Sequence, residues 1–254
     1  MLGERLVFKP TREHQQEPAQ LGLEPREVWL RSADGVALHG WFFSGSSDVV
    51  LVWFHGNRGN ISDRLDQIRL LLDALGVSIF IFSYRGYGKS EGSPSERGVS
   101  RDALAAAEWV QGLPDAQEII YFGRSMGCAT AIETAGVVPP SKLILEAPFL
   151  SIRLMAEETP LGNLAGRFLR IRFDNLTKIG KLAVPLMVIH GDRDDTVPFS
   201  HGVQLFKAAP EPKEFYGVAG AGHSDCPVVG GERYFHRLRR FIGDAIGETG
   251  QGVR

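Results

Sequence analysis

Short apolar segments alternate with helical patterns through most of this chain, and that alternation limits its fold more than any other feature. The apolar segments span residues 49–54, 77–84, 118–122, 142–146, 185–189 and 213–217. Between most of them apolar residues recur at helical spacing, as at Ile61, Leu65, Ile68 and Leu72. Buried strands that alternate with helices are typical of βαβ units. The fold class is therefore α/β, with a mainly parallel central sheet and helices on both faces.

The N-terminal part of the chain precedes this alternation. Residues 1–25 are polar and contain three prolines, so we expect an irregular arm. Residues 27–31 and 36–43 flank an Asp-Gly turn at residues 32–35 and predict an antiparallel hairpin at an edge of the sheet. In Ser93-Pro94-Ser95-Glu96 the first serine would cap a later helix, with Pro94 in the first turn and Glu96 three residues after the cap.

The interval between Pro148 and Pro185 contains no clear strand. We interpret residues 149–181 as a small cap insertion over the sheet, because long excursions in compact domains are usually functional. One more packing helix with loops is the alternative. The cations of this interval outnumber its acids, Glu157, Glu158 and Asp174; they are Arg153, Arg167, Arg170, Arg172, Lys178 and Lys181. They would bind an anionic leaving group or membrane surface, or simply form a solvated face.

The bulk properties exclude several classes of protein. A chain of 254 residues suits a single domain, residues 1–254, and its net charge of −2 gives no basic footprint for nucleic acid. Two cysteines, Cys128 and Cys226, form no disulfide framework, which favours a reducing compartment. The N-terminus lacks a signal sequence, and every apolar run is too short to span a bilayer. We therefore expect a cytoplasmic protein with no integral membrane segment, and the oligomeric state stays open.

Ser125 is the candidate nucleophile. The pattern Gly-x-Ser-x-Gly occurs twice, in Gly123-Arg124-Ser125-Met126-Gly127 and in Gly88-Lys89-Ser90-Glu91-Gly92. The chemistry needs a serine on a sharp strand-to-helix turn. Ser125 follows the apolar segment at 118–122 and precedes a small-residue helical run at 128–135, whose N-terminal amides would stabilise negative charge. Ser90 is followed by Gly92 and Pro94, so we interpret it as a loop residue.

The stretch from Ser83 to Ser90 also resembles a phosphate-binding loop that follows a strand. A Walker A motif needs glycine at the position of Ser83 and a helix that opens at Lys89-Ser90. The sequence has neither feature, so a nucleotide site is not expected here.

His223 is the candidate general base, because it lies in a Gly-rich loop directly after the last predicted strand. An orienting carboxylate should follow a strand between Ser125 and His223, and Asp192, Asp194 and Asp195 compete for that role. Spacing does not choose among them, and the two that do not orient the histidine should face solvent or bond to the turn. Asp192 and Asp194 lack a third ligand for a metal, so no metal or cofactor is expected.

Two backbone amides should hold the oxyanion. One is the amide of Met126, the residue after the nucleophile, and the other should come from the loop after an early strand. His55-Gly56-Asn57 follows the strand at 49–54, which makes the Asn57 amide the candidate. His55 itself is interpreted as a structural hydrogen-bonding residue of that loop.

Taken together, these motifs resemble the α/β-hydrolase superfamily, from the hairpin at Glu27 to the final helix. The resemblance rests on five ordered motifs: His55-Gly56-Asn57, residues 84–90, residues 123–127, His190-Gly191-Asp192-Arg193-Asp194 and Gly222-His223. It is strongest with a small-capped branch that contains bacterial carboxylesterases and protein depalmitoylases. The resemblance implies that Asp194 is the orienting acid and that residues 149–181 fall where that branch has its cap.

The expected function is that of a serine hydrolase, which cleaves an ester or thioester of a small-molecule or acylated substrate through an acyl-enzyme. A peptidase or amidase on the same fold is one alternative, and a cofactor-free haloperoxidase-like activity is also compatible with the same triad. A non-catalytic binding protein on a hydrolase scaffold is the alternative from a different class.

Overall fold

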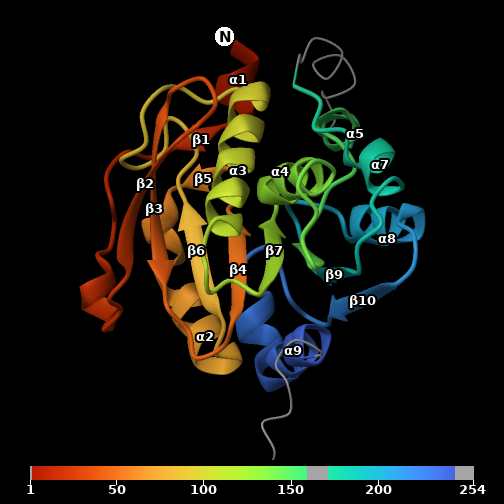
Figure 1. The fold of residues 1–254 in the computed structure, drawn as a ribbon. Coiled ribbons are helices and arrows are strands. Elements are labelled where there is room, and N and C mark those ends of the chain that lie inside the picture. The colour runs from red at the N-terminus through yellow and green to blue at the C-terminus, as the bar shows by residue number, and fades with distance from the viewer. Residues whose placement is uncertain (1, 159–170, 244–254) are drawn as a thin grey trace, which may run out of the picture.

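The computed structural model describes residues 2–158 and 171–243. Within them, eight strands form one sheet in the order β10-β9-β8-β7-β4-β6-β3-β2 (Figure 1). The strands are β2 (Arg26–Arg31), β3 (Ala37–Phe43), β4 (Val49–Phe54), β6 (Ser78–Phe82), β7 (Glu118–Arg124), β8 (Lys142–Glu146), β9 (Leu186–Gly191) and β10 (Lys213–Val218). The strands from β10 to β6 in this order are parallel, whereas β3 is antiparallel to both of its neighbours. The α/β prediction is confirmed.

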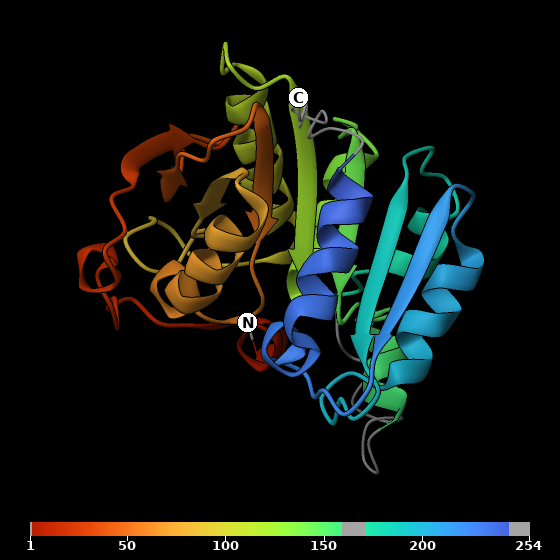
Figure 2. The same ribbon diagram turned by 90° about the horizontal axis from the view of Figure 1, so that it is seen from below.

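Helices cover both faces of the sheet (Figures 1 and 2). They are α1 (Leu2–Val7), α2 (Leu65–Leu75), α3 (Glu96–Gln111), α4 (Met126–Ala135), α5 (Ile152–Glu157), α7 (Asn175–Ile179), α8 (Phe199–Ala208) and α9 (Cys226–Ile242), with short 3₁₀ turns η1 (Pro18–Leu21) and η2 (Ile61–Arg64). Alternate residues of β4 enter different cores, because successive side chains of a strand point to opposite faces. Val50 and Val52 pack with α3 and α4, whereas Leu51 and Trp53 pack with α2 and α9.

Element boundaries follow the sequence pattern closely. Each predicted strand agrees with the structure to within two residues, and the hairpin forms as expected, with Arg31 paired to Ala37. The predicted start of α3 is wrong by two residues. Ser95, rather than Ser93, is the N-cap, and its side chain accepts a hydrogen bond from the Gly98 amide. Pro94 therefore lies before the helix instead of in its first turn.

The N-terminal arm is more regular than expected. It contains α1, η1 and a two-residue strand β1 (Lys9–Pro10), which pairs in parallel with β5 (Arg58–Gly59). Phe8 is 3% exposed and contacts the edge of the Phe173 ring, so the arm is packed into the main core. Its local sequence is polar, and the order comes from residues far along the chain.

The order of the strands creates a place for a site. The chain runs from β4 to its neighbour β6 on one side, and then returns to β7 on the other side of β4. In open α/β sheets, ligands bind at the carboxyl ends of two adjacent strands whose following connections run in opposite directions along the sheet. Phe54 pairs with Gly123, so the loop after β4 lies beside the residue that follows β7, Ser125.

The expected cap at residues 149–181 is described only at its two ends. Residues 149–158 contain α5 and residues 171–181 contain α7, while residues 159–170 lie outside the described part of the chain. Phe149, Leu150, Ile171 and Phe173 are buried in the main core. The described ends therefore pack into the body of the molecule, and a cap over the sheet stays a prediction.

Candidate active site

Ser125 occupies a strained turn between β7 and α4. Its backbone has φ 53° and ψ −120°, a conformation that costs energy for a residue with a side chain. The turn closes only because the residues two positions before and two positions after Ser125 are glycines. A Cβ on Gly127 would lie 1.8 Å from the Phe54 carbonyl oxygen, and one on Gly123 would lie 2.8 Å from the Cys128 Cα. The two glycines of the motif are thus required by close backbone contacts.

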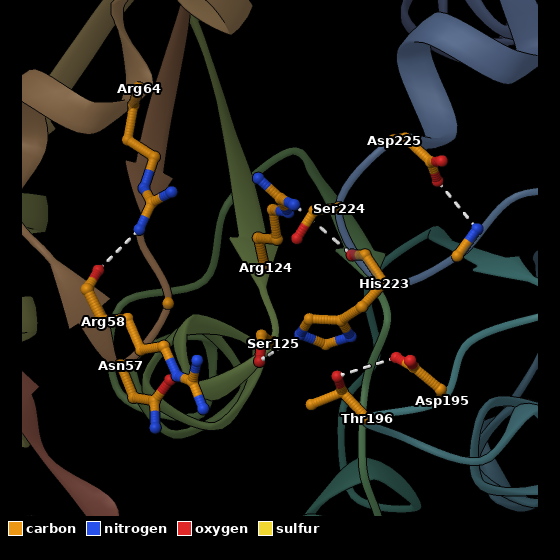
Figure 3. A pocket seen from close by; sticks show the side chains of 12 residues that line it. Asn57, Arg58, Arg64, Arg124, Ser125, Asp195, Thr196, His223, Ser224 and Asp225 are labelled. Atoms are coloured by element: carbon orange, nitrogen blue, oxygen red, sulfur yellow. Dashed lines mark hydrogen bonds between the residues drawn. The ribbon is translucent and has the colours of Figure 1, made fainter.

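His223 brings its imidazole ring between the serine and a carboxylate. Its Nε2 lies 3.0 Å from Ser125 Oγ, and its Nδ1 lies 2.8 Å from Asp194 Oδ2. Figure 3 shows the ring beside Ser125 at the mouth of a cavity. Nδ1 carries the proton if it donates to Asp194, which leaves the Nε2 lone pair free to accept the serine proton. The three residues singled out from the sequence therefore lie within hydrogen-bond reach of one another.

Asp194 is oriented by backbone and side-chain donors together. Its Oδ1 accepts from the amides of Thr196 and Val197, at 2.9 and 2.8 Å. Its Oδ2 lies 3.2 Å from His190 Nε2 as well as near His223. Burial alone would raise the pKa of this carboxyl, but the hydrogen bonds from His190, His223 and Val197 outweigh burial and hold the pKa well below its usual range. Asp194 is therefore an anion at neutral pH.

The competing carboxylates behave as expected for turn residues. Asp192 is exposed and accepts from the Gly220 amide at 2.7 Å. Asp195 is exposed and accepts from the Thr196 hydroxyl at 3.2 Å. Neither forms a hydrogen bond or ion pair with His223, so of the three candidate acids it is Asp194, the one that the resemblance implied, that lies beside the histidine.

The loop after β4 is held against the nucleophile by the N-terminal arm. A Cβ on Gly56 would lie only 3.5 Å from the Ser125 Cβ, which places this loop directly beside the serine. The Asn57 side chain donates to the Val7 carbonyl at 2.7 Å. The Asn57 carbonyl accepts from the Lys9 amide at 3.0 Å and from the Tyr87 hydroxyl at 2.8 Å. With these groups tied down, the Asn57 backbone is presented to the site in one conformation.

His55 is a structural residue of the same loop. It is fully buried, and its Nδ1 lies 2.7 Å from the Gly56 carbonyl. Burial, together with the nearby charge of Arg64, lowers the pKa of His55 to about 3. The ring is thus neutral at physiological pH, and it packs against Tyr84 and Tyr87.

The second Gly-x-Ser-x-Gly match has a structural role. The Ser90 hydroxyl donates to the Ser83 carbonyl at 2.7 Å and accepts from the His39 amide at 2.9 Å. Ser90 is buried, and no helix begins after it. Its hydroxyl links the loop to β3, which confirms the interpretation of Ser90 as a loop residue.

A cavity of about 460 Å³ opens beside Ser125 and His223. Three arginines that the sequence interpretation did not select line it: Arg58, Arg64 and Arg124. Figure 3 shows them around Asn57 and Ser125, while Asp195 and Asp225 lie on the opposite side of His223. Their positions in the sequence offered a signal, because Arg58 follows Asn57 directly and Arg124 precedes the nucleophile.

The basic residues expected to serve the site from the cap do not line this cavity in the described part of the chain. Arg153 pairs with Glu157 and Lys178 pairs with Glu133, both on the surface. Arg167 and Arg170 lie outside the described residues. Among the residues that the structure describes, positive charge at the cavity therefore comes from Arg58 after β4, from Arg64 of η2 and from Arg124 at the end of β7.

Within residues 2–158 and 171–243, no group of three or more histidine, cysteine or acidic side chains is arranged to hold a metal ion. Over the same residues, no helix has both the length and the apolar character needed to cross a membrane.

Comparison with known proteins gives consistent matches. Residues 45–178 match the family model described as serine aminopeptidase, S33. The α/β-hydrolase domain-containing protein WAV2 of Arabidopsis thaliana is 33% identical, and the match covers 94% of this chain and 87% of WAV2. The lysophosphatidylserine lipase ABHD12 of Danio rerio is 32% identical, and the match covers 68% of this chain and 50% of the lipase.

A solved structure shows the same fold. An esterase of Pyrococcus furiosus superposes with a TM-score of 0.79 at 22% sequence identity, and the match covers 95% of this chain and 99% of the esterase.

Proposed function

Because this chain belongs to the α/β-hydrolase family, we propose that it is a serine hydrolase that cleaves carboxylic ester or thioester bonds through an acyl-enzyme intermediate. One observation carries the proposal. Ser125 Oγ, His223 and Asp194 form a continuous hydrogen-bonded series, with distances of 3.0 and 2.8 Å. That arrangement is the one a serine needs in order to lose its proton to a base as it attacks a carbonyl.

The reaction would proceed in two displacements. Ser125 Oγ attacks the carbonyl carbon while His223 Nε2 accepts the hydroxyl proton, and Asp194 stabilises the imidazolium that results. The tetrahedral intermediate then collapses, and His223 returns the proton to the departing alcohol or thiol. A water molecule, deprotonated by the same nitrogen, releases the acyl group as a carboxylic acid.

The backbone amides of Asn57 and Met126 are our candidates for the oxyanion hole. Met126 is the first residue of α4, where helix amides have no partner within the helix and the helix dipole favours negative charge. Asn57 belongs to the loop that lies against Ser125. In sites of this kind, losing one donor raises the barrier by roughly 3–4 kcal/mol.

A peptidase or amidase is the second candidate, because the matching family model is described as a serine aminopeptidase. The lipase relative and the esterase of the same fold favour an ester as the first choice. The cytoplasmic location expected from the sequence stays a prediction.

A fluorophosphonate probe tests the nucleophile directly. We expect the wild-type chain to be labelled at Ser125, and Ser125→Ala to lose both the label and roughly 10⁴-fold or more of its esterase activity. Ser90→Ala is the matched control, since it removes the serine of the other Gly-x-Ser-x-Gly pattern; it should retain labelling. Esters, thioesters and aminoacyl amides of matched size then separate an esterase from a peptidase.

Two outcomes would contradict the proposal. A folded wild-type chain that resists labelling would favour a non-catalytic binding protein on a hydrolase scaffold. Ester hydrolysis that persists in Ser125→Ala would remove Ser125 from the mechanism.

A further inference from the structure

The cavity beside Ser125 is charged unevenly. Arg58, Arg64 and Arg124 line one side of it, and Asp195 and Asp225 line the other (Figure 3). The two carboxylates have local partners: Asp225 accepts from the Gly222 amide at 2.7 Å, and Asp195 accepts from the Thr196 hydroxyl. The three arginines differ in how their charge is compensated, and that difference points to a ligand.

Arg124 already has a carboxylate partner. Its Nε lies 3.1 Å from Glu146 Oε1, and both side chains are almost fully buried. Its remaining nitrogens contact Gln67 Oε1 at 2.7 Å and the His223 carbonyl at 3.3 Å. Arg124 is therefore neutralised and serves to position the loop that carries His223.

Arg64 has no such close partner, and only the nearby charge of Asp63 partly compensates its own. Its Nη2 donates to the Arg58 carbonyl at 2.6 Å, but its Nε is buried and has no hydrogen-bond partner in the described part of the chain. Over the same residues, no carboxylate lies within ion-pair distance of it. Burial, reinforced by the charge of Arg124, lowers the pKa of Arg64 to about 10, so the group is still a cation at neutral pH. The Arg64 side chain as a whole is half-buried, but its Nε is shielded from water, and a buried donor without a partner is costly.

Arg58 lies next to Arg64 at the same side of the cavity. Its side chain is exposed, and no hydrogen bond or ion pair of that side chain is found among the described residues. Its backbone is fixed, because β5 pairs with β1 of the N-terminal arm. Two arginines thus line the cavity that Ser125 also lines, and neither has a carboxylate partner within ion-pair distance in the part of the chain that the structure describes.

On the premise of the hydrolase function above, we propose that Arg58 and Arg64 bind an anionic group of the substrate, a carboxylate or a phosphate, while Ser125 attacks its acyl bond. A guanidinium presents donors in a planar fork that matches both kinds of oxyanion. The bound anion would accept a hydrogen bond from the buried Nε of Arg64 and compensate the positive charge of that side chain. The preferred substrates are therefore acidic esters rather than neutral ones.

Two pairs of esters test this preference. The first pair carries the charge on the alcohol half: 3-butyryloxybenzoate and its methyl ester. The second carries it on the acyl half: the p-nitrophenyl monoester of adipate and its methyl ester. For each pair, the ratio of kcat/KM for the anionic ester to that for the neutral ester is measured in the wild-type chain, in Arg64→Gln and in Arg58→Gln. Arg97→Gln is the control, since Arg97 is an exposed arginine of α3 that does not line the cavity.

For the ester pair whose charge lies against the arginines, we expect the ratio to fall at least about tenfold in Arg64→Gln, because a charged hydrogen bond is lost. Arg58→Gln should lower the same ratio less, and Arg97→Gln should leave it unchanged. Inorganic phosphate should inhibit hydrolysis of the anionic ester more strongly in the wild-type chain than in Arg64→Gln. A ratio that is the same in all four proteins for both pairs would overturn the proposal.

The test also distinguishes this inference from the proposed function. If no ester is turned over, the hydrolase proposal fails, and binding of the two anionic esters to Ser125→Ala, measured by ligand NMR, still tests the role of the arginines. Weaker binding of either ester to the double variant Ser125→Ala/Arg64→Gln supports the anion site, and unchanged binding of both esters overturns it. If Arg64→Gln fails to fold, as judged by thermal unfolding, the exposed substitution Arg58→Gln decides the result.

Discussion

Asp194 shows how a single residue of the site is oriented. One carboxylate oxygen is held by the amides of Thr196 and Val197, so the other is directed toward His223 and His190. His190 Nε2 also lies 2.9 Å from the Val197 carbonyl. Since both of its neighbours are acceptors, that nitrogen must carry the proton. The His-Gly-Asp motif thus contributes a second buried imidazole that supports the acid.

Replacing Asp194 by Asn tests the role of its charge. The amide keeps the shape of the side chain but offers a donor to His223 Nδ1, which favours the wrong tautomer. We expect kcat to fall by roughly 10³–10⁴-fold on an activated ester. Asp192→Asn is the matched control, because this exposed carboxylate bonds only to the Gly220 amide among the described residues. Similar losses in the two variants would argue against a specific role for Asp194.

At the scale of elements, a buried arginine joins the hairpin to α3. Arg85 is 7% exposed, and its guanidinium contacts Asp102 of α3 at 2.7 Å and Asp34 of the hairpin turn at 2.9 Å. The hydrogen bond from Arg85 holds the pKa of Asp34 well below its usual range. Arg101 reaches the same Asp34 from the surface, also at 2.9 Å. Within the motif at residues 84–90, Arg85 thus joins two elements, while Tyr87 supports the loop after β4.

The substitution Arg85→Leu tests whether this buried ion pair contributes more to stability than an ordinary surface ion pair does. It would leave the fully buried Asp102 without its partner, and we expect a loss of about 3–5 kcal/mol in the free energy of unfolding. Arg101→Leu removes a more exposed partner of Asp34 and should cost no more than about 1 kcal/mol. Urea denaturation measures both. Equal, small losses would show that Asp102 is readily accommodated without Arg85.

Across the whole molecule, several histidines are buried as neutral rings. Burial, reinforced by the charge of Lys89, lowers the pKa of His39 to about 4, and the pKa of His55 is about 3. His14 is buried beside His39, with its ring centre 5.6 Å away, and its pKa is also lowered, chiefly by burial. These rings connect the arm, the hairpin and the loop after β4, so their ionisation bears on how these parts stay together.

The stability of the protein should therefore fall with acid earlier than that of a protein whose histidines are exposed. Below an ordinary pKa of 6.5 the unfolded chain binds protons at His39 and His55, whereas the folded chain does not until the pH approaches 4 and 3. Between those values each ring lowers the free energy of unfolding by at most about 1.4 kcal/mol per pH unit. Urea denaturation at pH 7, 6 and 5 measures the slope.

Variants identify the source of that slope. His39→Gln keeps a donor for Glu27 but cannot ionise, so it should flatten the pH dependence. His236→Gln, at an exposed position, should leave it unchanged. A slope that is the same in both variants would mean that His39 is protonated in the folded state.

Two features could be predicted from the sequence because both depend on local patterns. They are the order of the elements and the positions of Ser125 and His223 in the hydrogen-bonded series. Apolar period, turn residues and chain order are all present within short windows, and they located each strand of the eight-stranded sheet to within two residues. The same windows located Ser125, since a strand, two glycines and a helix must adjoin it. Spacing alone left three acids open, and only the family resemblance pointed to Asp194, because its placement depends on backbone amides that only the folded turn positions.

The tertiary structure alone decided how the site is supported and what charge it presents. The arm at residues 1–25 has a polar, proline-containing sequence, yet it becomes ordered because β1 pairs with β5 and Asn57 bonds to Val7. Arg58 and Arg64 are two cations among many in the sequence. They become a candidate anion site only because the parallel pairing of β4 with β7 brings the segment after β4 to the cavity that Ser125 lines, where neither arginine has a carboxylate within ion-pair distance among the described residues. Periodicity reports which face of an element is buried, but the partner of a lone charge is set by contacts between distant segments, and no local pattern encodes those contacts.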